Sequence, residues 1–260
     1  MPQDAQSEIE DKGDRLIVWN GNAAKRGALT PELYEALTEA FERAKAPRIR
    51  ALILTSRGGF FCAGGDLNVL IARRELTQAE RREKVDQLHD LVRLLRASPV
   101  PVIAAVEGGA AGAGLSLALA CDMVVASKEA QFTAAYVKAG LVPDAGLTAA
   151  LARMVPRPLA MEMCLLGRPV AASRFAALGA VSLLCEPGEA LGGAMALADD
   201  LAAGPRAAQG TIRQLVAQAY ETSEAAQLDA ERDAMAEAAG AAEAGEGIAA
   251  FLEKRKPRFA

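Results

Sequence analysis

Short runs of apolar residues recur along the first half of the chain and constrain its fold more than any other feature. They occupy residues 15–19, 51–55, 101–106 and 123–126, with loops or helical patterns between them. A nearly all-apolar run of this length, bounded by turn residues, is typical of a strand buried on both faces. Because these strands alternate with helices, the sequence predicts an α/β core.

Helical patterns lie between these strands and fill the end of the chain. Residues 30–41 combine a Thr N-cap, a Pro in the first turn and apolar positions at helical spacing, and residues 72–97 are charged and helical. From about residue 190 only helical patterns remain. We therefore expect an α/β core over residues 1–195 and a helical segment over residues 196–260. That segment is too short for much core of its own, so it must pack on the body or on a neighbouring subunit.

Charge and hydropathy exclude two classes of partner. The chain has 29 Lys and Arg against 33 Asp and Glu, a formal net charge of −4, so we expect no nucleic-acid partner. No apolar run approaches the roughly 20 residues of a transmembrane helix, so we expect no membrane partner. The polar, acidic start, MPQDAQSEIEDKGDR, is unlike a secretory or transit peptide, and we expect a cytoplasmic location.

The cysteines and the one histidine argue against metal and triad chemistry. The four cysteines lie far apart in the chain: Cys62, Cys121, Cys164 and Cys185. With no C-x-x-C pair among them, we expect reduced thiols and no metal site. A Ser-His-Asp mechanism would have to use His89, and no nucleophile elbow accompanies it.

Two glycine-rich loops are the candidate sites of chemistry. One spans residues 61–67 and follows a predicted strand, and the other spans residues 108–114 and leads into an apolar helix. Small residues let backbone N–H groups approach a ligand, so the two loops could form an oxyanion hole. The alternative is that the glycines only permit tight strand–helix packing. The second loop lacks the G-x-G-x-x-G spacing of a dinucleotide site, and no G-K-[ST] phosphate loop occurs.

At these loops the sequence resembles the enoyl-CoA hydratase/isomerase, or crotonase, superfamily. The resemblance covers nearly the whole chain from about Arg15 and rests on several blocks in order: GALTPEL, ALILTSRGGFFCAGGDL, PVIAAVEGGAAGAGLSLALACDMVVAS, AQFTAAYVKAGLVPDAGLT and GIAAFLEKRKPRF. It implies a spiral of ββα units followed by C-terminal helices that build a homotrimer, often paired as a hexamer. It also implies an acyl-CoA thioester as substrate and partner, with no separate cofactor.

The resemblance carries specific roles onto this chain. The two oxyanion donors fall on the backbone N–H groups of Gly65 and Ala113. The remaining expected contacts with acyl-CoA are Lys25, Arg26, Ala28, Ala63, Gly64, Asp66, Leu67, Gly112, Tyr136, Phe251 and Lys254. Lys25 could equally be a solvated loop cation. The alternative for Lys254 is that its charge merely complements the negative end of a helix. Gly27 stands where many members carry Asn, which puts the local hydrogen bonding in question.

The hydratase reaction is disfavoured by two positions. Adding water across a conjugated double bond needs an acid and a base near the same two carbons. The two glutamates of family hydratases fall on Ser116 and Tyr136, and neither is a carboxylate. Ser116 lies within an apolar helix and is expected to be structural. Tyrosine has a pKa of about 10 in model peptides, so Tyr136 is expected to be a pocket wall.

Asp144 is the candidate carboxylate for an acid/base role. In isolation, the Pro143–Asp144 pair before a helix favours an N-cap role. The block AAYVKAGLVPDAGLT, however, resembles the ring-epoxide isomerases of phenylacetate degradation, whose Asp at this place is the catalytic acid/base. Leu147 departs from that subgroup, which usually has Gly. Asp66 and Asp122 are expected to order a loop and a turn.

A lone carboxylate beside an oxyanion hole suits a proton shuttle. The expected function is therefore an acyl-CoA isomerase that shifts a double bond or isomerises a ring epoxide, with Asp144 moving the proton. Three alternatives remain open: nucleophilic attack by Asp144, as in thioester hydrolysis or dehalogenation; a non-catalytic acyl-CoA binder; and a weak hydratase.

Overall fold

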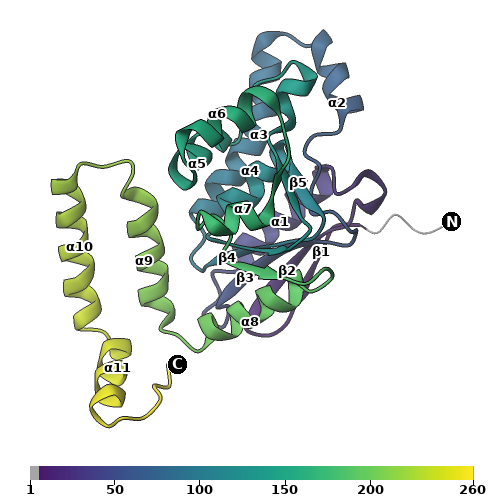
Figure 1. The fold of residues 1–260 in the computed structure, drawn as a ribbon. Helices are drawn as coiled ribbons and strands as arrows, with labels where there is room; N and C mark the ends of the chain where they lie inside the picture. Colours follow the sequence, from purple (N-terminus) through teal and green to yellow (C-terminus); the bar gives the residue numbers. More distant parts are fainter. Residues whose placement is uncertain (1–5, 260) are drawn as a thin grey trace.

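A six-stranded sheet forms the centre of the computed structural model, which describes residues 6–259 (Figure 1). Across the sheet the strands are β1 (Glu8–Asp11), β2 (Arg15–Asn20), β3 (Ala51–Ser56), β4 (Val102–Val106), β6 (Met123–Ser127) and β9 (Leu183–Cys185). β1 pairs antiparallel with β2, and the other neighbours are parallel. The α/β core predicted from the apolar runs is confirmed.

A small second sheet passes through the second glycine-rich loop. Its strands, in order, are β5 (Gly109–Ala111), β7 (Gln131–Thr133) and β8 (Val170–Ala171). Sequence reasoning missed β5 because glycine and alanine are depleted in strands and carry no strand signal. The second glycine-rich loop is thus held in place by its pairing with β7.

Helices connect the strands and form the C-terminal part of the chain. They are α1 (Pro31–Arg43), α2 (Leu67–Ala72), α3 (Gln78–Arg96), α4 (Ala113–Ala120), α5 (Leu147–Met154), α6 (Arg157–Leu166), α7 (Ala172–Ala177), α8 (Ala190–Ala202), α9 (Arg206–Gln218), α10 (Glu224–Ala239) and α11 (Ala242–Leu252). Short 3-10 turns are η1 (Ala23–Lys25), η2 (Arg73–Glu75) and η3 (Ala135–Ala139). The helix expected over 72–97 is interrupted, because Thr77 and Glu80 form a capping box that starts α3.

The sheet is buried on both faces. Leu16 and Leu52 point into a large cluster that includes the buried sides of α1, α3 and α4, whereas Ile17 and Ile53 point to the opposite face. That opposite face is covered by a stripe of small residues on α8, made of Ala190, Ala194 and Ala198. Alternating residues of one strand therefore serve two cores, which explains the continuous apolar runs in the sequence.

The C-terminal helices α9–α11 project from the body as an arm (Figure 1). The expected boundary at residues 195/196 lies inside α8, whose buried alanines on both sides of that point pack against the sheet. The arm exposes large apolar side chains, listed here: Ile212, Val216, Tyr220, Leu228, Met235, Ile248, Phe251 and Leu252. In a single chain this apolar surface faces solvent.

Arg213 attaches the start of the arm to the body. Its guanidinium, which is nearly buried, donates to Asp122 at 2.6 Å and to the carbonyl oxygens of Arg96 and Ser98 at 2.7 and 2.8 Å. A further bond reaches the carbonyl of Leu95. The carbonyl acceptors lie at or just after the C-terminal end of α3, where carbonyl groups lack helical partners.

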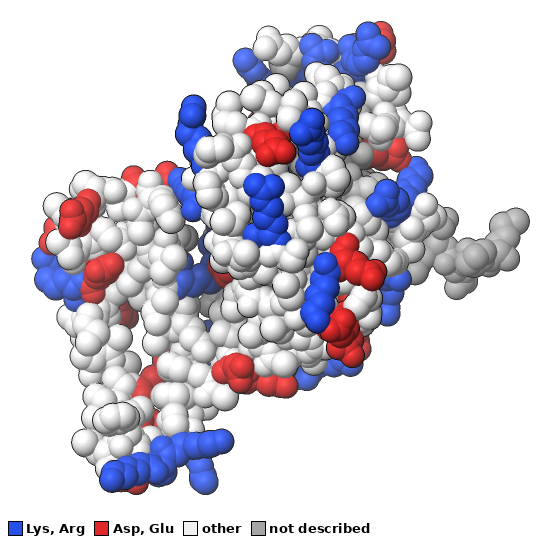
Figure 2. Space-filling model, in the orientation of Figure 1, with Lys and Arg blue, Asp and Glu red and all other residues white. Residues whose placement is uncertain are grey.

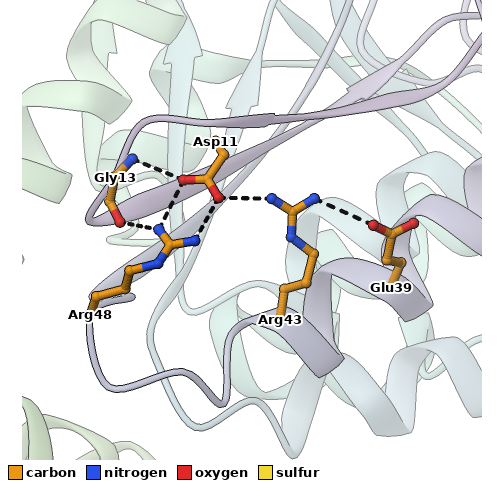
Figure 3. A network of polar contacts seen from close by, with 5 residues as sticks. All are labelled: Asp11, Gly13, Glu39, Arg43 and Arg48. Carbon is orange, nitrogen blue, oxygen red and sulfur yellow. Dashed lines mark hydrogen bonds and ion pairs between the residues drawn. The ribbon is translucent and has the colours of Figure 1, made fainter.

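A network of ion pairs fixes the β1–β2 turn against α1 (Figure 3). The carboxylate of Asp11 accepts from Arg48 at 2.6 Å and from Arg43 at 2.8 Å, and Arg43 also reaches Glu39. The Arg48 guanidinium, with the Gly13 N–H, holds the pKa of Asp11 well below its usual value. The network therefore ties the end of the edge strand β1 to the end of α1 and to the segment that follows it.

Candidate active site

The two glycine-rich loops lie directly against each other. Cys62 forms a parallel bridge with Ala110, and its carbonyl accepts from the Ala111 N–H at 2.9 Å. A Cβ on Gly64 would lie 2.8 Å from the Ala111 carbonyl oxygen, and one on Gly114 would lie 2.1 Å from the Cys62 carbonyl oxygen. Glycine is therefore required at both places, because no side chain fits between the two backbones.

Two backbone N–H groups at this junction are free. Within residues 6–259, neither Gly65 nor Ala113 donates an N–H hydrogen bond. Ala113 is the first residue of α4, where helical donors are unpaired, and its N-cap, Gly112, has no side chain to accept from it. Both residues line one cavity. Two unpaired donors facing one cavity are what an oxyanion hole requires.

The cavity that these donors line is about 310 Å³ in volume and mainly apolar. Its walls come from the start of α1, the first glycine-rich loop, α2, α3, the start of α4, and η3 with the turn after it. The carboxylates on its wall are Asp66 and Asp144. A site of this kind, apolar with a few convergent polar groups, is typical of a small-molecule pocket.

Asp144 is held in the cavity by a tyrosine. The Tyr136 hydroxyl donates to Asp144 Oδ1 at 2.7 Å, and the Ser116 hydroxyl lies 3.0 Å from the Tyr136 oxygen. Ser116 also donates to the Asp144 carbonyl oxygen at 3.2 Å. Burial, followed by the charge of Asp144, raises the pKa of Tyr136, so this phenol stays protonated. The two hydroxyls at the glutamate positions thus form a chain that ends on Asp144.

The side chain of Asp144 does not cap the following helix. α5 begins at Leu147 with Gly146 as its N-cap, and that cap has no side-chain hydrogen bond. The turn is supported instead by His89 on α3, whose Nε2 accepts from the Ala145 N–H at 3.2 Å. Ala145 has a φ of 50°, which side-chain-bearing residues rarely adopt. The capping alternative fails because the carboxylate turns toward Tyr136.

Comparison with known proteins identifies the family. The model of the enoyl-CoA hydratase/isomerase family matches residues 21–260. The chain belongs to this family. It is 37% identical over 251 residues to the 1,2-epoxyphenylacetyl-CoA isomerase of Escherichia coli strain K12, covering 96% of this chain and 95% of that protein. It is 34% identical over 244 residues to the 2,3-dehydroadipyl-CoA hydratase of the same strain, covering 94% of each.

A solved structure supports the same assignment. The crystal structure of an enoyl-CoA hydratase from Polaromonas sp. JS666 matches with a TM-score of 0.94 at 41% sequence identity, covering 98% of this chain and 99% of that one. The expected crotonase-like fold is therefore confirmed, and an acyl-CoA substrate class fits the family. Among the described residues, no helix is long and apolar enough to cross a membrane, and no cluster of His, Cys, Asp and Glu could hold a metal.

The loop expected to contact CoA is ordered by its own contacts. Lys25 Nζ lies 2.5 Å from Asp66 Oδ2, and the same carboxylate group caps α2 by accepting from the Asn68 N–H at 2.9 Å. The Lys25 ion pair, with that cap, lowers the pKa of Asp66. The Arg26 guanidinium stacks on Phe60 at 3.9 Å. Lys25 and Arg26 do not line the cavity, although Asp66 does.

Glycine at position 27 is explained by packing. A Cβ there would lie 2.5 Å from the Phe61 carbonyl oxygen, and its φ is +68°. Asn20 donates to the Gly27 carbonyl at 2.7 Å. Ala28 is buried next to it, and its carbonyl accepts from Asn22 at 2.8 Å.

The other expected substrate contacts divide into three groups. Ala63, Leu67, Gly112 and Tyr136 line the cavity. Gly64 lies buried behind it, and its carbonyl accepts from the Leu29 N–H at 2.8 Å. Phe251 and Lys254 lie at the end of α11 on the arm, outside the cavity, and Phe251 is 83% exposed. One chain by itself therefore does not bring these two residues to the site.

Several polar residues of the cavity were missed from the sequence. Tyr34 on α1, Arg73 in η2, and Lys84 and Gln87 on α3 all line it. Burial raises the pKa of Tyr34 to about 12. No motif contains these residues, and a polar residue on a helix is ordinarily solvent-facing, so only the packing of α1 against α3 shows that they meet.

Proposed function

We propose that this protein is an acyl-CoA isomerase in which Asp144 is the single proton shuttle and CoA is part of the substrate rather than a separate cofactor. The observation that supports it best is the Tyr136–Asp144 hydrogen bond of 2.7 Å within the cavity that Gly65 and Ala113 also line. This bond presents one carboxylate in a defined orientation beside two free N–H donors. The reaction is a double-bond shift or the isomerisation of a ring epoxide.

The proposed reaction proceeds through an enolate. The N–H groups of Gly65 and Ala113 donate to the thioester oxygen, which makes the adjacent C–H acidic. Asp144 takes a proton from C2 of a 3-enoyl-CoA, the electrons delocalise into the thioester, and the same carboxyl returns the proton at C4. Removing one such oxyanion donor costs about 3–4 kcal/mol in comparable enzymes.

The cavity offers poor support for hydration. A hydratase needs a second acid or base beside the substrate double bond. The other carboxylate on the wall, Asp66, is paired with Lys25 and caps α2. The hydroxyls of Ser116 and Tyr136 are engaged with each other and with Asp144. Since relatives include both an isomerase and a hydratase, the two activities have to be separated by experiment.

The test is a small panel of acyl-CoA thioesters in deuterated water. We expect deuterium at C2 or C4 of a 3-enoyl-CoA and conversion to the 2-enoyl isomer, or isomerisation of the ring epoxide of phenylacetyl-CoA. Asp144→Asn should lose at least about 100-fold in rate, the usual contribution of a general acid–base group. The matched control is Asp90→Asn, which changes an exposed carboxylate on α3 outside the cavity.

Four outcomes contradict the proposal. Full isomerase activity in Asp144→Asn shows that Asp144 is not the proton shuttle. Hydration of crotonyl-CoA at ordinary enzymatic rates makes the protein a hydratase. Tight acyl-CoA binding with no exchange at any acyl carbon makes it a binding protein. Label from heavy-oxygen water in the Asp144 carboxyl instead supports nucleophilic catalysis.

We also propose that the arm is covered by neighbouring copies in a trimer or hexamer. The exposed apolar side chains of α9–α11, such as Val216 and Met235, support this. In such an assembly Phe251 and Lys254 would reach the CoA of an adjacent subunit. Sedimentation of the full chain tests the assembly, and Lys254→Glu should raise the KM for acyl-CoA. We further propose that the protein takes part in phenylacetate degradation and is located in the cytoplasm.

A further inference from the structure

One part of the cavity wall carries hydrogen-bond donors that have no partner. The side chains of Tyr34, Arg73 and Lys84 line the cavity, and none of them makes a hydrogen bond or ion pair within residues 6–259. Figure 2 shows that the charged side chains over α2 and its surroundings, at the top of the view, are mostly Lys and Arg. The remaining wall of the cavity is largely apolar.

The two carboxylates of the cavity already interact with other residues and not with Tyr34, Arg73 or Lys84. Asp66 is paired with Lys25 at 2.5 Å, and Asp144 accepts from Tyr136 at 2.7 Å. An arginine and a lysine can only donate, and the buried Tyr34 phenol is an O–H donor at neutral pH. Tyr34 and Arg73 are half-buried, whereas Lys84 is exposed. A half-buried donor without an acceptor is costly, so Tyr34 and Arg73 favour a ligand that brings oxygen acceptors, and Lys84 adds a positive charge at the cavity wall.

Tyr34, Arg73 and Lys84 line the same cavity as Asp144. In the proposed reaction Asp144 acts on acyl carbons close to the thioester. Other polar groups on the same cavity wall are therefore available to contact the acyl chain beyond those carbons.

We infer that the acyl group of the natural substrate ends in a carboxylate, which Arg73 binds with support from Tyr34 and Lys84. This inference rests on the proposed function, because it assumes an acyl-CoA in this cavity. A guanidinium matches a carboxylate with two parallel N–H···O bonds, a geometry that an ammonium does not offer. The surrounding apolar residues, such as Val69, Leu70 and Leu88, pack on the methylene groups.

The test compares binding of saturated acyl-CoA pairs of equal chain length by titration calorimetry. Glutaryl-, adipoyl- and suberoyl-CoA are measured against pentanoyl-, hexanoyl- and octanoyl-CoA, since none of these carries a double bond to shift. We expect at least one carboxylate-bearing member to bind about tenfold or more tightly than its neutral partner, as for a hydrogen bond to a charged group. Arg73→Met should abolish this preference, and Tyr34→Phe should reduce it.

The control variants separate binding from folding. Arg74→Met changes the exposed neighbour, which does not line the cavity, and should keep the preference. Arg73→Lys should keep part of it. An unchanged affinity of Arg73→Met for hexanoyl-CoA shows that the cavity is intact in that variant.

The outcomes distinguish this inference from the proposed function. Equal affinity of the native protein for both members of every pair overturns the carboxylate inference alone. If Arg73→Met weakens the binding of hexanoyl-CoA, adipoyl-CoA and free CoA equally, the cations bind a CoA phosphate. The inference is then again overturned. If no acyl-CoA binds at all, the proposed function itself fails.

Discussion

The contact between Gly114 and Cys62 gives the sharpest prediction about how the site is held together. In Gly114→Ala the new Cβ would lie 2.1 Å from the Cys62 carbonyl oxygen, whereas side-chain carbons essentially never approach closer than 3.0 Å. The two loops must therefore separate by about 0.9 Å or more. The same carbonyl accepts from Ala111 at 2.9 Å, so the bond between the loops is strained as well.

The expected magnitude follows from that displacement. Overpacking a core site by a methyl group costs about 1–3 kcal/mol, which outweighs the 0.5–1 kcal/mol that alanine gains over glycine within a helix. At about 2–4 °C per kcal/mol for a chain of this size, the melting temperature should fall by several degrees. A misplacement of about 1 Å between the Gly65 and Ala113 donors should lower kcat/KM about 100-fold.

Thermal unfolding and initial rates on the active acyl-CoA together check this prediction. The control is Gly192→Ala on α8, where a Cβ meets nothing within 4 Å, so stability should rise slightly and activity should not change. If Gly114→Ala melts like the native protein and retains kcat/KM within threefold, the close approach of the loops does not position the oxyanion donors.

Two further predictions concern the framework around the site. Arg213→Met should lower the free energy of unfolding by about 1–3 kcal/mol, because the carbonyl groups of Arg96 and Ser98 lose their nearly buried donor, and Asp122, which is partly exposed, loses its cation. Chemical denaturation checks this against Arg232→Met, which changes an exposed arginine on α10; equal midpoints would contradict the anchoring role. Asp11→Asn should lower the melting temperature by a constant amount above about pH 5, and the difference should shrink below about pH 3.8, the ordinary pKa of this carboxyl. The sign follows because the folded-state pKa is lowered, so its stabilisation is present above the unfolded pKa and is lost as the pH falls toward the folded one. A difference that instead grows toward pH 3 in melting scans would refute the network shown in Figure 3.

Several elements could be predicted from local sequence. Thr30 accepts from the Leu33 N–H, as its place before Pro31 predicts, and the apolar runs became the parallel strands. Both signals are local, since a cap acts over three residues and a buried strand shows its environment along its own length. β5 and the break between α2 and α3 were not predicted, because the first depends on pairing with β7 and the second on a capping box inside a charged stretch.

The candidate site shows the same division. Gly65, Ala113 and Asp144 were selected through family blocks, and the cavity brings them together. The choice between capping and acid–base roles for Asp144 was open in the sequence. The structure decides between these roles through the contacts of Asp144 with Tyr136, eight residues earlier, and of Tyr136 with Ser116 on α4.

The amino-acid sequence by itself determined the α/β class and the positions of the glycine-rich loops, which depend on residue type and on spacing along the chain. The family resemblance added that Ser116 and Tyr136 stand where hydratases carry glutamates. Only the tertiary structure decided where the Asp144 carboxylate points and that Tyr34, Arg73 and Lys84 share one cavity. Those facts depend on distances between segments far apart in the chain, which side-chain packing sets and periodicity does not encode.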